Sequence, residues 1–565
     1  MSRNACRFLR PYLSRNVKPI SNPDHARIYC AIQRRFSHNV SEDIYSTLSS
    51  NHDAEKRLAE LKRAGDLNAY HPRLTDNSAA QRHSVASFLA KYEGIEAGDK
   101  LLNESLTALG RIRSRRTAGN KLVFLDIERQ TGKFQGMCDF GVLAEHGVSL
   151  EDFKQFKKVV RKGDWFSITG YPKRTSSGEL SLVATELPKS LAPSLHSIPE
   201  TIEDLETLSR HPHVRQLVNR QSGDILRLRS RIYQLLRTFL TDRDFMEVET
   251  PMFDVGAGGA IARPFETVAT EMMDATLRLR IAPELSLKRL VIAGNEKVFE
   301  MGRVFRNEGV DTTHNPEFTI CEFYEVGATL EDLILRTETL FREISSMIQG
   351  CHATEFPSIP APTVDFSNPF QRLAFIPTIE SAIGQPLPDL SAPDATSTIL
   401  SLYETLSLTV PTNPTLPRLL DDLAEHYIEP LCTTPTFITH HPEALSPLSK
   451  SFLDPITNQR VAARVELFIK GREYVNAYEE ENSPFEQRRK FEQQLGFQPA
   501  KADAGVCVDE SYIEALEWGM PPTGGWGCGV DRLVMLFGGK KRIADVLPFG
   551  TLRNVVAIAR NGKDR

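Results

Sequence analysis

The sequence predicts an α+β protein with several domains, and three observations support this prediction. Its 565 residues and mass of 63.4 kDa exceed what one compact core usually holds. Hydrophobic residues make up 41% and charged residues 25%, which are ordinary values for a globular protein. A run of short strand-like segments precedes a longer region in which helix-like and strand-like patterns both occur.

The N-terminal segment 1–40 is basic, although the whole chain has a formal charge of −5. Its eight Lys and Arg residues stand against a single acid, Asp24. It is rich in Arg, contains Ser and lacks a continuous apolar run, which is typical of a mitochondrial transit peptide. We therefore expect residues 1–40 to direct the protein to the mitochondrial matrix, with a disordered basic tail as the alternative.

Cysteine spacing and hydropathy exclude several classes of protein. The eight cysteines are scattered without a CxxC pair or a Cys/His cluster, so neither a disulfide framework nor a structural zinc site is indicated. No stretch approaches the roughly 20 consecutive apolar residues of a membrane span, so we expect no membrane partner. Because the chain beyond the leader is acidic, a nucleic acid would have to bind local basic patches.

Three segments follow the basic leader. Residues 41–98 look helical and polar, and we expect an N-terminal extension. In residues 99–190, five strand candidates at hairpin spacing, with a helical stretch at 150–160, predict a five-stranded OB-fold β-barrel. A β-rich module that binds nothing is the alternative. A Pro-containing linker at 187–200 leads into the long region 200–565.

The C-terminal region opens with an amphipathic helix at 223–240. Its apolar residues at helical spacing are Ile225, Leu228, Ile232, Leu235 and Phe239. A strand-like segment follows and ends at Pro251. Residues 351–420 contain eleven prolines and many Ser and Thr residues, and we expect them to form a surface insertion.

Two segments combine arginine with carboxylates or glycines. In 305–326, alternation places Phe318, Glu322 and Tyr324 on one face of a strand, downstream of the sequence RNEG that contains Arg306. A planar guanidinium there suits a phosphate, and a salt-bridged strand pair is the alternative. In 519–539, alternate glycines allow a ligand to approach the backbone before a helix begins near Arg532. Neither GxGxxG nor a P-loop is present here.

These segments resemble the three signature motifs of class II aminoacyl-tRNA synthetases, and in detail those of the lysyl-tRNA synthetase family. Matching stretches are IAPELSLKRL (281–290), VFEMGRVFRNEG (298–309), HNPEFT (314–319), PTFITHHPEALSPL (435–448) and ELFIKGREYVNAYEEEN (466–482). The resemblance covers roughly residues 100–565. It implies a catalytic domain at 200–565 with an antiparallel sheet flanked by helices, and a homodimer formed through the first motif.

The resemblance also implies ATP-dependent activation of lysine, followed by transfer to the 3′ end of tRNA(Lys) in mitochondrial translation. Arg306 and Arg532 are then the catalytic arginines, which contact the reacting carboxylate and the phosphates. The ATP-binding residues implied by the match are Arg306, Glu308, His314, Asn315, Phe318 and Arg532. Glu466 and Glu473 match the acids that bind Mg²⁺, a metal that prefers oxygen ligands. A solvated acidic face is the alternative for these two acids.

Lysine recognition and anticodon recognition follow from the same match. The lysine-binding residues implied are Gly259, Glu284, Glu322, Tyr324, Asn476, Tyr478, Glu480 and Gly527. In the barrel, Phe124 is expected to stack on a base, and the polar readers are Arg116, Gln135 and Glu179. A core position is the alternative for Phe124.

Two departures from the family pattern and two competing functions accompany this assignment. Asp244 stands where the first motif usually has glycine, and GAGGA (256–260) replaces the more usual PGGA. An aspartyl or asparaginyl enzyme is disfavoured, because Glu284 and Glu480 would line an amino acid pocket that needs cations. A non-catalytic RNA-binding homologue is the other alternative, although the phosphate arginines and metal acids are retained.

Overall fold

The computed structural model describes residues 52–74, 81–129, 132–202, 211–254, 262–497 and 508–561. The expected leader, residues 1–40, and the expected lysine ligand Gly259 lie outside the described residues. The chain divides between Ile198 and Pro199 into two compact units. Among the described residues, every helix is too short or too polar to cross a bilayer.

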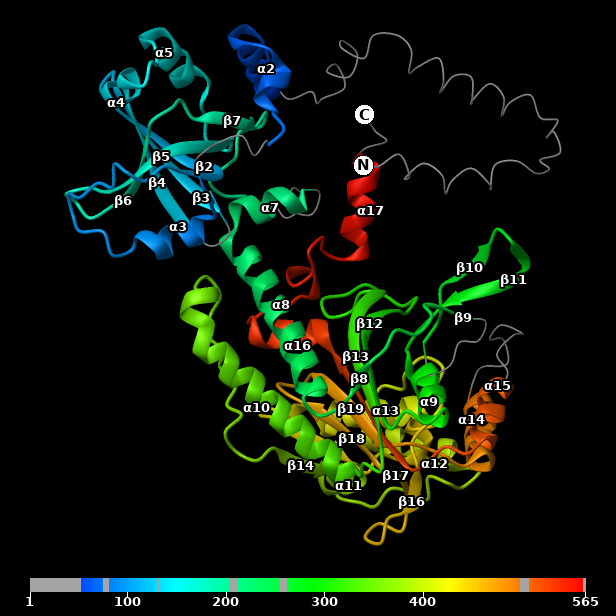
Figure 1. Ribbon diagram of the computed structural model, residues 1–565. Helices are drawn as coiled ribbons and strands as arrows, with labels where there is room; N and C mark the ends of the chain where they lie inside the picture. The colour runs from blue at the N-terminus through cyan, green and yellow to red at the C-terminus, as the bar shows by residue number, and fades with distance from the viewer. Residues whose placement is uncertain are drawn as a thin grey trace, which may run out of the picture. The chain divides into compact units, whose positions relative to one another are not determined.

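The first unit is a seven-stranded sheet with the order β1-β2-β3-β4-β6-β5-β7, in which β2 also pairs with β5 (Figure 1). Its strands are β1 (Gln81–His83), β2 (Leu106–Ala118), β3 (Leu122–Arg129), β4 (Gly132–Asp139), β5 (Trp165–Arg174), β6 (Leu180–Ala184) and β7 (Lys189–Ala192). Its helices are α2 (His52–Ala64), η1 (Leu67–Tyr70), α3 (Val85–Tyr92), α4 (Phe140–Glu145) and α5 (Leu150–Val159).

Strand β3 shows how the core of this unit is made. Val123, Leu125 and Ile127 are fully buried, whereas Phe124 and Asp126 between them are only half-buried. Successive side chains of a strand point to opposite faces, so β3 presents its apolar side to the core and Phe124 to the other face. The structure therefore places Phe124 outside the core cluster.

The described part of the expected N-terminal extension belongs to this unit. Arg57 of α2 is 1% exposed and its Nη2 donates to Oδ2 of Asp164 at 2.9 Å. Phe88 of α3 is buried in the same core as Phe134 of β4. The expected linker also contributes, because β7 pairs with β5. These segments complete the first unit, and they are not separate appendages.

The second unit contains an eight-stranded sheet with the order β14-β15-β18-β19-β20-β13-β12-β8. These strands are β8 (Met246–Glu247), β12 (Lys297–Phe305), β13 (Glu317–Val326), β14 (Gln371–Ala374), β15 (Thr436–Thr439), β18 (Arg464–Phe468), β19 (Glu473–Glu479) and β20 (Thr523–Gly529). The smaller sheets contain β9 (Phe253–Asp254), β10 (Glu266–Ala269) and β11 (Met272–Leu279), and β16 (Ser451–Leu453) with β17 (Arg460–Ala462).

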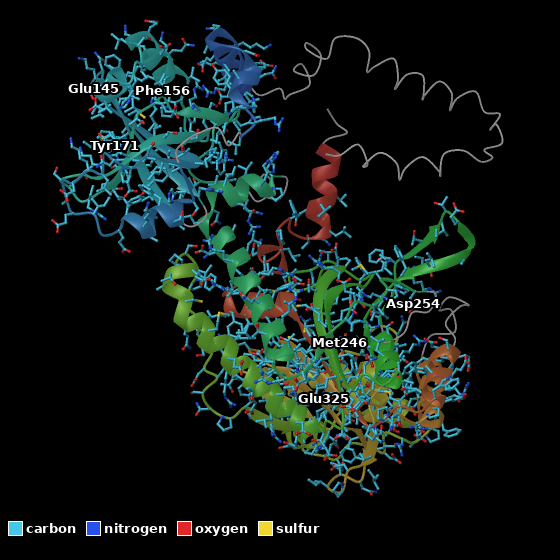
Figure 2. All side chains as sticks on the ribbon, viewed as in Figure 1. Glu145, Phe156, Tyr171, Met246, Asp254 and Glu325 are labelled. Carbon is cyan, nitrogen blue, oxygen red and sulfur yellow. The ribbon has the colours of Figure 1, made fainter. Side chains whose placement is uncertain are left out.

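Helices surround this sheet. They are α7 (Pro212–Val218), α8 (Arg220–Thr241), α9 (Glu284–Ile292), α10 (Leu330–Glu355), α11 (Phe375–Ile383), α12 (Ala395–Leu406), α13 (Leu416–Tyr427), α14 (Pro484–Gly496), α15 (Glu510–Glu517), α16 (Val530–Phe537) and α17 (Leu552–Asn561). Three short 3-10 helices are η2 (Glu429–Leu431), η3 (Glu443–Leu445) and η4 (Ile543–Asp545). Figure 2 shows side chains filling the space around the strands near Met246 and Glu325.

The sheet is antiparallel in its centre but not at its edges. Strand β12 pairs with β13 and β13 with β20 in antiparallel fashion, as do β20 with β19 and β19 with β18. At one edge β14 pairs with β15 in parallel, and at the other β8 pairs with β12 in parallel. The expected antiparallel sheet therefore has two parallel edge pairs, because long crossovers bring these edge strands back to the sheet.

Helix α8 packs on the core as the 3.6-residue period predicts, with one shift. Leu236 is fully buried, whereas the expected Leu235 is only half-buried. Downstream of α8, Asp244 has a φ of 66°, in the left-handed region that glycine adopts without strain. This conformation explains why glycine suits the position at which this sequence has Asp.

Residues 351–420 differ from the expected surface insertion. They supply β14, an edge strand of the main sheet, and Phe370 packs on Phe437 of β15 with ring centroids 5.6 Å apart. Helices α11, α12 and α13 enclose a second apolar cluster that includes Ile379, Tyr403 and Leu419. Prolines occur beside or in the first turn of helices that are buried on one face, such as Pro417 at the start of α13. A high proline content therefore did not indicate an exposed segment.

Candidate active site

Strand register brings three predicted lysine-binding residues into one row. Gly527 of β20 lies opposite Glu322 of β13 on one side and opposite Asn476 of β19 on the other. The next row of the same face holds Tyr324, Gly525 and Tyr478. The central strand carries glycine in both rows, so the outer side chains can lean over it. These two rows gather predicted lysine-binding residues on one face of the sheet.

Helix α9 packs beside β13 and brings further charged side chains to this face. Glu284, in its first turn, accepts a hydrogen bond at Oε1 from the hydroxyl of Tyr478 at 2.7 Å. Lys288, one turn later, is fully buried, and its Nζ lies 2.6 Å from Oε1 of Glu284. The same ammonium forms an ion pair with Glu480, which is 1% exposed. The structure thus brings Glu284, Tyr478 and Glu480 together around a cation that the sequence analysis did not single out.

Glu322 is buried on the same face. The hydroxyl of Tyr324 donates to its Oε2 at 3.3 Å. Burial and the neighbouring charge of Glu284 raise the pKa of Glu322 to about 8. Glu284, Glu322 and Glu480 are each at most 5% exposed, so three buried acids gather around one buried ammonium, that of Lys288.

A glycine is required at position 525 because of these acids. A Cβ added to Gly525 would lie 1.8 Å from Oε1 of Glu480 and 2.7 Å from Cε1 of Tyr324. A Cβ at Gly527 would meet its nearest neighbour, Cγ of Glu322, at 3.5 Å, which is ordinary contact. The backbone of β20 therefore makes room for these side chains mainly at Gly525.

Three predicted ATP-binding or metal-binding residues meet near the start of α16. Nη1 of Arg532 donates to Oε2 of Glu473 at 3.1 Å, and Nη2 lies 3.2 Å from Nε2 of His314. Asp531 anchors this helix, since its Oδ2 accepts from the backbone N–H of Thr319 at 2.7 Å. The guanidinium of Arg532 is thereby held beside β13 in reach of a phosphate.

Arg306 and Phe318 form a second predicted pair. The Arg306 guanidinium lies 5.2 Å from the centroid of the half-buried Phe318 ring. Glu308, just beyond β12, is exposed. Asn315, another predicted ATP-binding residue, forms two hydrogen bonds with the backbone. It is 9% exposed, its Nδ2 donates to the backbone oxygen of Glu317 at 2.6 Å, and its Oδ1 accepts from the N–H of Leu552 at 2.9 Å. These bonds give Asn315 a role in holding the fold.

Acids gather around the predicted metal ligands Glu466 and Glu473. Glu466 is paired with Arg464 and with Nε2 of His441 at 3.0 Å, and these partners lower its pKa to about 2 despite its burial. Burial and the charges of four acids, Glu425, Asp421, Glu466 and Glu473, raise the pKa of Glu429 to about 7. Among the described residues, no three His, Cys, Asp or Glu side chains form a complete metal cage. Two acids with a surplus of negative charge fit Mg²⁺ bound jointly with substrate phosphates.

Comparisons with known proteins identify the family. The family of class II tRNA synthetases for D, K and N matches residues 204–553, and an OB-fold nucleic acid binding domain matches 106–189. The mitochondrial lysine–tRNA ligase of Schizosaccharomyces pombe is 37% identical over 94% of this chain and 98% of its own length. This chain belongs to the class II lysyl-tRNA synthetases.

Other relatives of this lysyl-tRNA synthetase come from different settings. Lysine–tRNA ligase cla4 of Cladosporium cladosporioides is 38% identical over 84% of this chain and 80% of its own length. The probable cytoplasmic lysine–tRNA ligase of Encephalitozoon cuniculi is 39% identical over 76% of this chain and 88% of its own length. These matches confirm the predicted family and leave the compartment open.

The OB-fold domain of the synthetase places the predicted anticodon residues on neighbouring strands. Arg116 of β2 lies opposite Phe124 of β3, with its guanidinium 5.7 Å from the ring centroid. Gln135 of β4 is 7% exposed, and its Oε1 accepts from the hydroxyl of Ser181 at 3.0 Å. Glu179 is exposed just before β6. Phe124, Arg116 and Gln135 thus share one region of the sheet.

Sequence analysis missed two cations of the synthetase site. Lys288 follows Glu284 by four residues on a helix, and this spacing was a visible signal for an ion pair. Arg464 lies two residues before Glu466 on β18 and therefore on the same face of the strand. Its Nε donates to Oδ1 of Asn476 at 3.0 Å. With its oxygen engaged, Asn476 has its amide nitrogen available to donate to a substrate carboxylate.

Proposed function

We propose that this lysine–tRNA ligase serves mitochondrial translation and that the pocket between α9, β13, β19 and β20 binds its lysine. The observation that carries the lysine site is the set of three buried carboxylates, Glu284, Glu322 and Glu480, on one glycine-floored pocket. Buried acids are costly unless a cation compensates them, and a lysine substrate brings two ammonium groups. An uncharged analogue would leave Glu322, which forms no ion pair among the described residues, without a compensating cation.

The reaction begins with attack of a lysine carboxylate oxygen on the α-phosphorus of ATP. A new P–O bond forms, the bond to the bridging oxygen breaks, and pyrophosphate leaves with its electron pair. Arg306 is suited to bridge the two reacting groups, and Asn476 to orient the carboxylate. Arg532, held by Glu473 and by the Asp531 anchor, is suited to bind the terminal phosphate. Mg²⁺ beside Glu466 and Glu473 would neutralise phosphate charge.

Adenine is proposed to stack on the ring of Phe318, from which the Arg306 guanidinium would move toward the phosphates. Glu308 is exposed at the end of β12 and would reach the adenine amino group. His314, whose Nε2 lies 3.2 Å from Nη2 of Arg532, would approach the phosphates together with that arginine. These roles fit a bent ATP that lies across β13 toward α16.

The OB-fold domain is proposed to be a closed barrel that reads the anticodon of tRNA(Lys). Support for closure comes from β2, which pairs with both β3 and β5, so the series β2-β3-β4-β6-β5 returns to its first strand. Support for base stacking comes from Phe124, which lies outside the core beneath an arginine. Arg116, Gln135 and Glu179 would contact base edges or phosphates.

A homodimer and a mitochondrial location complete the proposal. Apolar side chains around the first motif are exposed, with Met246 and Met252 at 46% and Phe253 at 55%, which suits burial against a second copy. Light scattering that gives the mass of two chains would support the dimer. The basic segment 1–40 and the mitochondrial relative from Schizosaccharomyces pombe support the location, and a cytoplasmic relative from Encephalitozoon cuniculi keeps it a proposal.

Pyrophosphate exchange with each of the twenty amino acids tests the substrate. We expect ATP–pyrophosphate exchange with lysine alone. Exchange with aspartate or asparagine would contradict the lysine site, and absence of exchange with every amino acid would favour the non-catalytic alternative. Arg532→Ala is the control for ATP chemistry, because it should abolish exchange while the acidic pocket remains intact.

A further inference from the structure

Lys288 is buried among the residues expected to bind lysine. Its side chain is fully buried, and its Nζ contacts the carboxylates of Glu284 and Glu480. The rings of Tyr324 and Tyr478 flank the ammonium, with centroids 6.0 and 5.6 Å away. Lys288 thus joins α9 to the end of β19 through two residues of the proposed lysine pocket.

The formal charges of the proposed lysine site suggest a role for the Lys288 ammonium. With Glu284, Glu322 and Glu480 all in the carboxylate form that would bind a cationic ligand, these buried acids carry a formal charge of −3. Lys288 reduces this charge to −2. Free lysine carries two ammonium groups, and its carboxylate has separate partners in Arg306 and Asn476. Within the described part of the chain Glu322 has no ion-pair partner inside the protein, so it remains available to a ligand cation.

We infer that Lys288 is a positioning residue that sets the specificity of the lysine site: it cross-links Glu284 and Glu480 and leaves two negative charges for the two ammonium groups of the substrate. This inference rests on the proposed lysine pocket. Without Lys288, a substrate with two positive charges would leave one buried carboxylate uncompensated. Glu284 and Glu480 would also lose the contact that fixes their distance from each other.

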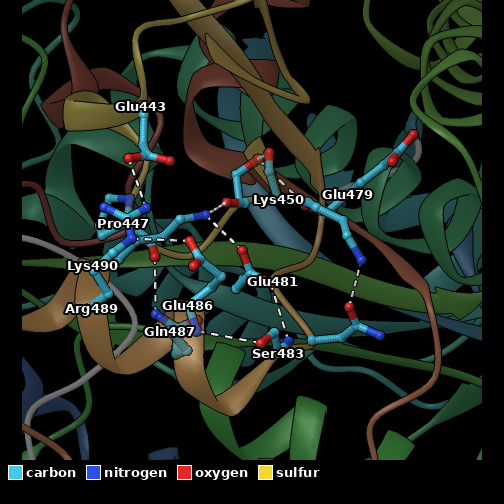
Figure 3. A network of polar contacts seen from close by, with 12 residues as sticks. Glu443, Pro447, Lys450, Glu479, Glu481, Ser483, Glu486, Gln487, Arg489 and Lys490 are labelled. Atoms are coloured by element: carbon cyan, nitrogen blue, oxygen red, sulfur yellow. Dashed lines mark hydrogen bonds and ion pairs between the residues drawn. The ribbon is translucent and has the colours of Figure 1, made fainter. Parts of the chain in front are cut away.

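The first experiment compares Lys288→Met with Lys490→Met. Lys490 is a matched control, since it is 2% exposed and its Nζ lies 2.7 Å from Oε2 of Glu481 (Figure 3). Its partners lie in the network around Glu481 and Glu443. We expect Lys288→Met to raise the lysine KM roughly 10- to 100-fold, with the ATP Kd from calorimetry unchanged. Lys490→Met should change the lysine KM less than threefold.

A charge-restoring variant separates charge from packing. Lys288→Met combined with Glu480→Gln again leaves two carboxylates in the pocket, those of Glu284 and Glu322. We expect the double variant to bind lysine at least tenfold more tightly than Lys288→Met alone. A purely structural role for Lys288 predicts that the double variant binds lysine no better than the single variant, and that result would overturn the inference.

The remaining outcomes are also decisive. A lysine KM for Lys288→Met within threefold of the wild-type value overturns the inference. If Lys288→Met alone fails to fold, judged by loss of ATP binding, the double variant decides: recovered ATP and lysine binding supports the charge count, and no recovery contradicts it. Failure of the wild-type protein to activate lysine would contradict the proposed function itself, which the same exchange assay shows separately.

Discussion

Single residues of the proposed lysine site are held in unusual electrostatic states by their neighbours. Glu322 is the clearest case, because burial and the charge of Glu284 raise its pKa to about 8. A carboxyl with a raised pKa binds a proton more tightly in the folded chain than in the unfolded one. Its contribution to stability is therefore complete below about pH 4 and is lost as the pH rises through about 8.

Lysine affinity should depend on pH through Glu322. Lysine requires the carboxylate form, whose fraction in the free protein rises about tenfold per pH unit below the pKa. We predict that the calorimetric Kd for lysine falls up to about tenfold per unit between pH 6.5 and 7.5, and levels off above pH 8. Glu322→Gln should bind lysine weakly with a flat profile over this range. An equally steep profile in Glu322→Gln would assign the titration to another group.

At the scale of elements, the local sequence predicted which residues share one face of a single strand or helix, but not which distant residues they contact. Strand β13 carries Phe318, Ile320, Glu322 and Tyr324 at every second position. Because side chains of a strand point alternately to its two faces, the sequence alone predicts that these four share one face. Glu480, the partner of Lys288 just beyond β19, is 192 residues away in the chain, and no local pattern connects the two. Strand β14 was missed for the same reason, because only its pairing with β15 makes its four residues a strand.

Strand β20 gives an element-scale prediction about glycine. Gly525→Ala should reduce kcat/KM for lysine at least roughly 100-fold, because its Cβ would overlap the carboxylate of Glu480. Gly529→Ala is the matched control in the same strand, since its Cβ would lie 3.6 Å from the flexible Arg532 side chain. Pyrophosphate exchange measures both variants. Equal activity of the two would mean that the pocket can rearrange around position 525.

Strand β3 gives a second prediction, on tRNA. Phe124→Ala should weaken aminoacylation by the equivalent of about 1 to 3 kcal/mol in kcat/KM for tRNA, because one base stack is lost. Pyrophosphate exchange should stay near normal, since activation of lysine does not use the anticodon. Phe140→Ala is the control, because the partly buried Phe140 packs against the core, with its ring centroid 5.5 Å from that of Phe153. It should lower thermal stability without a selective effect on tRNA.

At the scale of the whole molecule, length and composition predicted several domains, strand spacing predicted the OB-fold, and the resemblance of the ordered motifs predicted the class II synthetase family. Segment boundaries were harder to predict. Residues 41–98 look polar in sequence, yet within them α3 buries apolar side chains in the OB-fold core and Arg57 makes an ion pair with Asp164. Polar sequence with a few well-spaced apolar residues did not distinguish a separate extension from an element that covers a core.

The leader can be tested in living cells. Replacing Arg3, Arg7, Arg10 and Arg15 with Ser should move a fluorescently tagged protein from mitochondria to the cytosol, because import depends on the positive charges of the leader. A chain that begins at Ser41 should keep full aminoacylation in vitro while losing import. Unchanged localisation of the four-fold variant would identify segment 1–40 as a basic tail without a targeting role.

The edge strand β14 limits how far this enzyme can be shortened. Its four residues cover the main-chain groups of β15, and Phe370 just before it packs on Phe437. Excising residues 351–420 to obtain a minimal synthetase would uncover a strand whose residues are all buried. Such a truncated enzyme would expose a template for intermolecular strand pairing. A compact redesign would have to retain β14 or install a substitute edge before any catalytic residue is altered.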